Sequence, residues 1–143
     1  SNIIVKKKNI TISSVINNEI KQELEIDNYY HGINLDVQIK NAINANDFKK
    51  FIDNINLWIN YIKANAVLEY NRDNVYNSKV LPNYIDCLPQ NLILTDEGLN
   101  YIDKEWLLLK DFTLFTLMKR LLAILKLFII INIQISPLKT SLN

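Results

Sequence analysis

Residues 81–106 read LPNYIDCLPQNLILTDEGLNYIDKEW and form the most informative stretch of the chain. Three polar side chains stand out from an apolar background, namely Asp86, Asn91 and Asp103. The rest of the sequence carries no pattern of comparable specificity. Any hypothesis about function therefore depends on how these three residues are arranged.

The segment between Asn91 and Asp103 predicts a short β-hairpin. Residues 92–94 and 99–102 are compatible with strands, and Gly98 in the turn between them can adopt a positive φ. The two open ends of a hairpin lie side by side. We therefore expect Asn91 and Asp103 to be neighbours in space.

An Asn and an Asp held together offer oxygen ligands for a hard divalent cation. Proteins usually hold Mg²⁺ with one or two such side chains, and phosphates and water complete the shell. Asp86 lies five residues before Asn91, and Pro89 stiffens the loop between them. A carboxylate in that position can orient an attacking hydroxyl and accept its proton.

The segment from Asp86 to Asn91, DCLPQN, resembles the catalytic loop of the protein-kinase-like fold, in which Asp is followed by four residues and Asn. Asp103 and Glu105 resemble the metal-binding Asp-x-Glu of aminoglycoside and choline phosphotransferases, and residues 30–35 (YHGINL) resemble their hinge-to-helix connection. The resemblance implies that Asp86 is the catalytic base and that Asn91 and Asp103 are metal ligands. It also implies Mg²⁺ and ATP as cofactors.

This sequence departs from the kinase pattern at several points. Tyr84 and Leu88 occupy positions where those kinases carry His or basic residues. The chain has only two glycines and no Gly-rich phosphate loop. Most of a nucleotide-binding N-lobe is therefore missing from this sequence.

A second resemblance is to a region of bacterial methyltransferase and glycosyltransferase polypeptides that build surface polysaccharides. There the region follows the methyltransferase domain. The matching positions are Leu81, Pro82, Asp86, Pro89, Asn91, Ile93, Asp103, Glu105 and Trp106. In this comparison Glu105 and Trp106 support the site, and the chain is a transferase-associated module.

Purely structural interpretations of the same residues remain open. Asp86 and Asn91 can satisfy backbone amides of their own loop, and Asp103 can cap a short helix starting near Lys104. Cys87 is not expected to be a nucleophile, because the only histidine, His31, is far away in the sequence.

Composition narrows the class of protein. The chain has 143 residues, of which 49% are hydrophobic, and a net charge of +1, which predicts one folded domain. Its only basic block is Lys6–Lys8, so no nucleic-acid partner is expected. A single Cys fits a reducing, cytoplasmic location.

The flanking segments predict mostly helices. Asn34 can cap a short helix whose apolar face holds Leu35, Ile39, Ala42 and Ile43. The next helix has Asp47 near its start and carries the clearest apolar stripe, formed by Phe48, Phe51, Ile52, Ile55, Ile59, Ile62 and Ala66. Trp58 lies off this stripe and either widens the core face, the favoured interpretation, or contacts a partner. Residues 1–30 predict a strand-like or irregular lead-in.

The C-terminal part predicts a helix with Leu114, Leu117, Met118, Leu121, Leu125 and Phe128 on one face. We expect it to be buried and to run into a strand-like tail that ends at Pro137. Residues 121–135 are too short for a membrane span and contain Lys126, which leaves only peripheral association with a membrane open.

Together these patterns predict an α+β, mostly helical chain that resembles an incomplete protein-kinase-like C-lobe with a small β-hairpin. We expect residues 1–143 to be a single domain from a longer polypeptide, with residues 31–143 as the C-lobe-like part and other domains of that polypeptide as partners. Three functions remain open: a module of a surface-polysaccharide transferase, a small-molecule phosphotransferase lacking its N-lobe, and a non-catalytic interaction domain.

Overall fold

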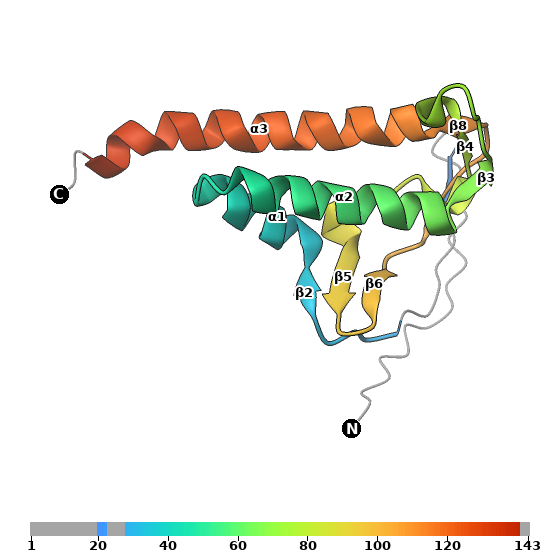
Figure 1. Cartoon of the computed structure of the whole chain (residues 1–143), viewed down its shortest axis with the longest axis horizontal. Helices are drawn as coiled ribbons and strands as arrows, with labels where there is room; N and C mark the ends of the chain where they lie inside the picture. Colours follow the sequence, from blue (N-terminus) through green and yellow to red (C-terminus); the bar gives the residue numbers. More distant parts are fainter. Residues whose placement is uncertain (1–19, 23–27, 141–143) are drawn as a thin grey trace.

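The computed structural model describes residues 20–22 and 28–140, with side chains up to residue 131, and shows an α+β fold. Of the lead-in predicted at residues 1–30, residues 1–19 and 23–27 lie outside the described residues. In the described part, α3 lies beside the α1–α2 pair, and the β2–β5–β6 sheet extends from the other side of that pair (Figure 1). The β3–β4–β8 sheet lies near the N-terminal end of α3.

Polar side chains cap the first two helices, as predicted for Asn34. In α1 (Leu35–Asn44), the Asn34 side chain accepts hydrogen bonds from the backbone N–H groups of Asp36 and Val37. In α2 (Phe48–Asn65), the Asp47 side chain accepts from the N–H of Lys50. Local polar side chains therefore determine where both helices start.

The buried side of α2 differs from the predicted stripe. Trp58 lies off the stripe but is fully buried, which confirms the widened core face, whereas Phe48 lies on the stripe and is 74% exposed. Ile62 and Ala66 are buried as predicted. The core-facing surface of α2 is thus rotated toward Trp58, because the loop that contains Cys87 packs there and accepts a hydrogen bond from the Trp58 indole.

The predicted hairpin is confirmed. Strands β5 (Leu92–Thr95) and β6 (Gly98–Tyr101) pair antiparallel in the register Leu92↔Tyr101 to Thr95↔Gly98. Gly98 has a φ of 118°, a conformation that favours glycine. Strand β2 (Ile33–Asn34) adds to the free edge of β5, so the sheet order is β2–β5–β6.

Gly32 is needed for a close approach between two segments of this sheet. A Cβ atom at Gly32 would lie 2.2 Å from the backbone oxygen of Leu94, which is far inside van der Waals contact. The absence of a side chain therefore lets the segment before α1 lie directly against β5.

Two further small sheets were not predicted. Strands β3 (Val67–Glu69), β4 (Lys79–Val80) and β8 (Phe112–Thr113) form one of them in the order β3–β4–β8. Strands β1 (Ile20–Gln22) and β7 (Trp106–Leu108) pair antiparallel to form the other. Strands of two or three residues have too few side chains to show an alternating pattern, which is why the sequence did not reveal them.

The C-terminal helix α3 (Leu114–Thr140) is longer than predicted, and the expectation of a strand-like tail ending at Pro137 is wrong. The apolar run contains no glycine that would end the helix. Pro137 removes a single backbone donor, and α3 continues for one further turn beyond it. Within the described residues, no helix meets the length and hydropathy needed to cross a bilayer.

One hydrophobic core joins these elements. Its fully buried members come from α1, α2, the loop of residues 85–91, the hairpin and the first half of α3; among them are Leu35, Trp58, Leu88, Leu92 and Leu117. Residues 85–91 are therefore packed between the helices and the hairpin.

Candidate functional site

The loop from Asp86 to Asn91 is compact and internally bonded. The N–H of Leu88 donates to the carbonyl of Asp86 at 2.8 Å, and the N–H of Asn91 donates to the carbonyl of Leu88 at 2.9 Å. Pro89 starts a 3₁₀ turn, Pro89–Asn91, as its fixed φ favours. This backbone brings the side chains of Asp86 and Asn91 to the same side.

The Asn91 side chain contacts Asp86 directly. Its amide nitrogen donates to a carboxylate oxygen of Asp86 at 2.8 Å and to the Asp86 carbonyl at 2.9 Å. Because the nitrogen faces Asp86, the amide oxygen of Asn91 points elsewhere. The side chain thus binds Asp86 while keeping an oxygen to offer to another group.

The hairpin brings Asp103 next to this pair. The N–H of Ile102 donates to the carbonyl of Asn91 at 2.9 Å, so the residue before Asp103 is bonded to Asn91 itself. Asp103 has a φ of 54°, which turns the chain sharply at the end of the hairpin. The expected proximity of Asn91 and Asp103 is therefore present in the backbone.

This geometry also tests the purely structural interpretations of Asp86, Asn91 and Asp103. No helix begins after Asp103, because a turn and then β7 follow it, so the interpretation as a helix cap is wrong. The loop interpretation of Asp86 and Asn91 holds in part, since the Asn91 amide does bond a backbone carbonyl of its own loop.

Arg120 on α3 is a site residue that the sequence did not reveal. One of its guanidinium nitrogens lies 3.0 Å from a carboxylate oxygen of Asp86, and the other donates to the carbonyl of Ile85. The Asp86 carboxylate is therefore held on one oxygen by Asn91 and on the other by Arg120. The only signal in the sequence is an arginine within a mostly apolar helix.

Asn34 is a second residue whose role the sequence showed only in part. Besides capping α1, its amide nitrogen donates to the carbonyl of Gln90 at 2.7 Å. The segment that resembles a hinge is thus bonded to the loop that resembles a catalytic loop. A contact across 56 positions of sequence cannot be recognised from local pattern.

A cavity of about 470 Å³ opens beside Asp86. Its walls are Ile20, Ile85, Asp86, Trp106, Leu108 and Arg120. Trp106, expected to support the site, therefore does border the same space as Asp86, whereas Glu105 lies in the turn before β7. Among the described residues, its lining combines apolar side chains with one carboxylate and one guanidinium, as small-molecule sites commonly do.

The titratable groups behind the loop are kept neutral by burial. Burial raises the pKa of the Cys87 thiol, and the thiol is fully buried. A protonated, inaccessible thiol is not a nucleophile, which agrees with the expectation for Cys87. Burial likewise raises the pKa of the Tyr101 and Tyr84 hydroxyls, whose rings lie 5.2 Å apart.

The described side chains of the site offer oxygen atoms as metal ligands. Among the described residues, no three or more His, Cys, Asp or Glu side chains cluster in a way that would hold a metal ion. Asn91 and Asp103 supply two oxygen-bearing side chains at the open end of the hairpin. This donor set fits Mg²⁺ only where a ligand's phosphates and water complete the shell.

Comparison of the chain with models of protein families, with curated proteins and with solved structures finds no match. The resemblance to kinase-like and transferase polypeptides therefore stays a prediction, carried by the residues quoted for it. The function is therefore inferred from the geometry of the loop, the hairpin and the adjacent cavity.

Proposed function

We propose that the chain is a cytoplasmic module of a bacterial transferase polypeptide, of the methyltransferase or glycosyltransferase type, acting in surface-polysaccharide biosynthesis. Its loop and hairpin carry a kinase-like site for Mg²⁺ and a nucleotide. The observation that carries the proposal is the bonded pair of Asn91 and Asp86, at 2.8 Å, beside the hairpin end that holds Asp103.

In this proposal Asn91 and Asp103 hold the metal. The nitrogen of the Asn91 amide is turned to Asp86, which directs its oxygen away from that carboxylate. A bound Mg²⁺-nucleotide would supply the transferable phosphoryl group and neutralise its charge. The hairpin keeps the two ligands together because its backbone bonds Asn91 to Ile102.

Asp86 is oriented toward the cavity by its two partners. Asn91 and Arg120 each hold one carboxylate oxygen, so the side chain has little freedom to rotate. An acceptor hydroxyl in the cavity would lie beside this carboxylate, where Asp86 can accept its proton. Trp106 gives the acceptor an apolar wall.

The ion pair with Arg120 also favours a second candidate, a non-catalytic interaction domain. In that candidate the carboxylate, bonded on both oxygens, fastens α3 to the loop and has no catalytic role. The remaining alternative is a phosphotransferase whose N-lobe lies elsewhere in the polypeptide. A Gly-rich loop with a lysine upstream in the reading frame would support that alternative, and a methyltransferase domain upstream would support the main proposal.

Thermal unfolding with and without Mg²⁺-ATP tests the nucleotide site. A ligand at 100 times its dissociation constant stabilises a protein by about 2.7 kcal/mol, so the unfolding temperature of the wild type should rise. The informative variant is Asp103→Asn, because Asn tolerates the φ of 54° at this position while the charge is removed. We expect this variant to lose most of the shift.

Asp96→Asn is the matched control, since Asp96 lies exposed in the turn at the other end of the same hairpin. It should keep the full shift. An unchanged unfolding temperature in the wild type, or a shift that survives in Asp103→Asn, would contradict the nucleotide site and favour the interaction domain.

A further inference from the structure

The outward side of α3 carries an alternating apolar and basic row. Its members, spaced four, three, four and four residues apart, are Phe115, Lys119, Leu122, Lys126 and Ile130. Residues at these spacings share one side of a helix. Both lysines are exposed, and Phe115, Leu122 and Ile130 are 52%, 58% and 41% exposed. We call these five residues the outer row.

The outer row is not needed to build the core. The opposite side of α3 supplies the core with Leu114, Leu117, Leu121 and Leu125, all of them buried. Leu127, Ile129 and Ile131 add further exposed apolar surface to the helix. A helix that is apolar on both sides needs a second apolar environment besides its own core.

The charges on α3 are of one sign. Residues 114–140 contain Lys119, Arg120, Lys126 and Lys139 and no Asp or Glu. Arg120 turns inward to Asp86. The charges of the outer row are therefore lysines only, in a chain whose net charge is just +1. The Lys119 ammonium lies over the Phe115 ring, 5.1 Å from its centre, so the two kinds of side chain overlap along the row.

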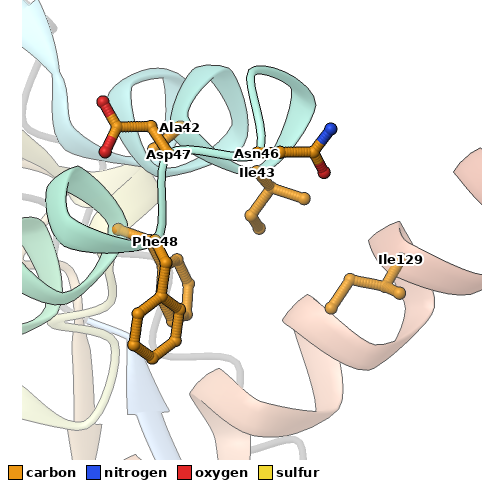
Figure 2. A pocket seen from close by; sticks show the side chains of 7 residues that line it. Ala42, Ile43, Asn46, Asp47, Phe48 and Ile129 are labelled. Atoms are coloured by element: carbon orange, nitrogen blue, oxygen red, sulfur yellow. The ribbon is translucent and has the colours of Figure 1, made fainter.

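The apolar surface continues from α3 to the start of α2. A cavity of about 300 Å³ lies between α3 and the α1–α2 connection, with Ile43, Phe48 and Ile129 in its lining. Figure 2 shows Ile43 directed into this space, while the Asp47 carboxylate points away from it. Phe48 is the most exposed phenylalanine of the described part, at 74%.

We propose that the outer row of α3 docks on the surface of a bilayer that contains anionic lipids. The apolar side chains would enter the boundary of the acyl chains, and the lysine ammonium groups would reach the lipid phosphates while their stems stay in apolar contact. Because the inner side of α3 is packed on the core, the helix lies along the membrane surface. This proposal is independent of the nucleotide site.

A second copy of the chain is a poorer occupant of this surface. Self-association through the outer row would bring Lys119 and Lys126 of one copy against the same lysines of the other. No carboxylate on α3 could neutralise them. Lipid phosphates provide the negative charge that α3 lacks.

Flotation with lipid vesicles tests the proposal. The wild-type chain should bind vesicles of phosphatidylcholine mixed with phosphatidylglycerol, bind phosphatidylcholine alone much less, and dissociate as the salt concentration rises. Leu122→Gln should lower the partition coefficient by about tenfold, as expected when a buried leucine is lost. Lys126→Gln should reduce the preference for anionic vesicles.

Leu68→Gln is the matched control, because Leu68 on β3 is 59% exposed and lies outside α3. It should bind like the wild type, and circular dichroism should show unchanged helix content in all variants. Equal binding to both kinds of vesicle, or no effect of Leu122→Gln, would overturn the proposal. So would a failure to bind vesicles together with a dimer in sedimentation that Leu122→Gln abolishes.

Discussion

Helices α2 and α3 both pack apolar side chains on the core, but they differ in the side chains that they expose to solvent. On α2, the solvent-facing surface includes the exposed ion pair Lys49–Asp53, with 2.7 Å between nitrogen and oxygen. On α3, the corresponding surface is the outer row, in which lysines alternate with Phe115, Leu122 and Ile130. The predicted apolar face of α3 is the buried one, whereas Phe48 on the predicted stripe of α2 is exposed. The comparison shows that an apolar pattern identifies a helix more reliably than it identifies the exact buried side.

The sharpest test of this comparison uses two consecutive leucines. Leu121 is 2% exposed and Leu122 is 58% exposed. We expect Leu121→Ala to lower the free energy of unfolding by about 2–5 kcal/mol, because the deletion leaves a cavity in the core. Leu122→Ala should change it by less than about 0.5 kcal/mol.

Urea unfolding of the two variants measures this difference. Both substitutions introduce the same residue into the same helix, so helix propensity cancels between them. Similar losses in both variants would mean that the outer row is covered within the chain, and would remove the basis for a membrane-docking surface.

A second test concerns the rotated buried side of α2. The Trp58 indole donates to the Cys87 carbonyl at 2.8 Å and is fully buried. We expect Trp58→Phe to cost about 1–3 kcal/mol, because a buried carbonyl loses its donor. Phe48→Ala, at the exposed start of the helix, should cost about 0.5 kcal/mol or less.

Chemical denaturation followed by circular dichroism gives both values. If Phe48→Ala proved the more damaging of the two, the helix would be packed on the stripe that the sequence alone predicted. The contact between Trp58 and the loop of residues 85–91 would then carry little of the stability.

The prediction with the smallest expected effect compares the hydroxyl of the buried Tyr101 with that of the exposed Tyr70. The Tyr101 hydroxyl donates to the Asn83 carbonyl at 3.0 Å, so Tyr101→Phe should cost about 1 kcal/mol at neutral pH. Burial raises the pKa of Tyr101 above its ordinary value of 10.0 and raises that of Tyr61 to about 12. The protein should therefore lose stability as the pH rises above about 10, since the unfolded chain releases these protons first.

Tyr101→Phe should make this alkaline decline shallower, as measured by unfolding at a series of pH values. Tyr70→Phe, at a position 60% exposed, is the control and should follow the wild type throughout. An alkaline decline that is identical in wild type and Tyr101→Phe would contradict the role assigned to Tyr101.

Features governed by neighbours in the sequence were predicted well. The cap at Asn34, the start of α2 near Asp47 and the turn at Gly98 are where the sequence indicated them, because each depends on a side chain and a backbone only a few residues apart. The proximity of Asn91 to the Asp103 end of the hairpin follows from that turn.

Features governed by distant contacts were missed. Arg120 reaches Asp86 across 34 positions, and Trp58 reaches Cys87 across 29. Strand β7 exists because β1 pairs with it, and nothing in Trp106–Leu108 alone distinguishes a strand from a loop. Such contacts depend on how the helices pack, which local patterns do not encode.

The sequence by itself determined the hairpin, the starts of α1 and α2, and the grouping of Asn91 with the Asp103 end of the hairpin, because backbone sterics and short-range hydrogen bonds act within a few residues. Only the tertiary structure decided that Arg120 would hold Asp86 and that Trp58 rather than Phe48 would be buried. These outcomes depend on which surfaces exclude water together, and that is a property of the packed chain.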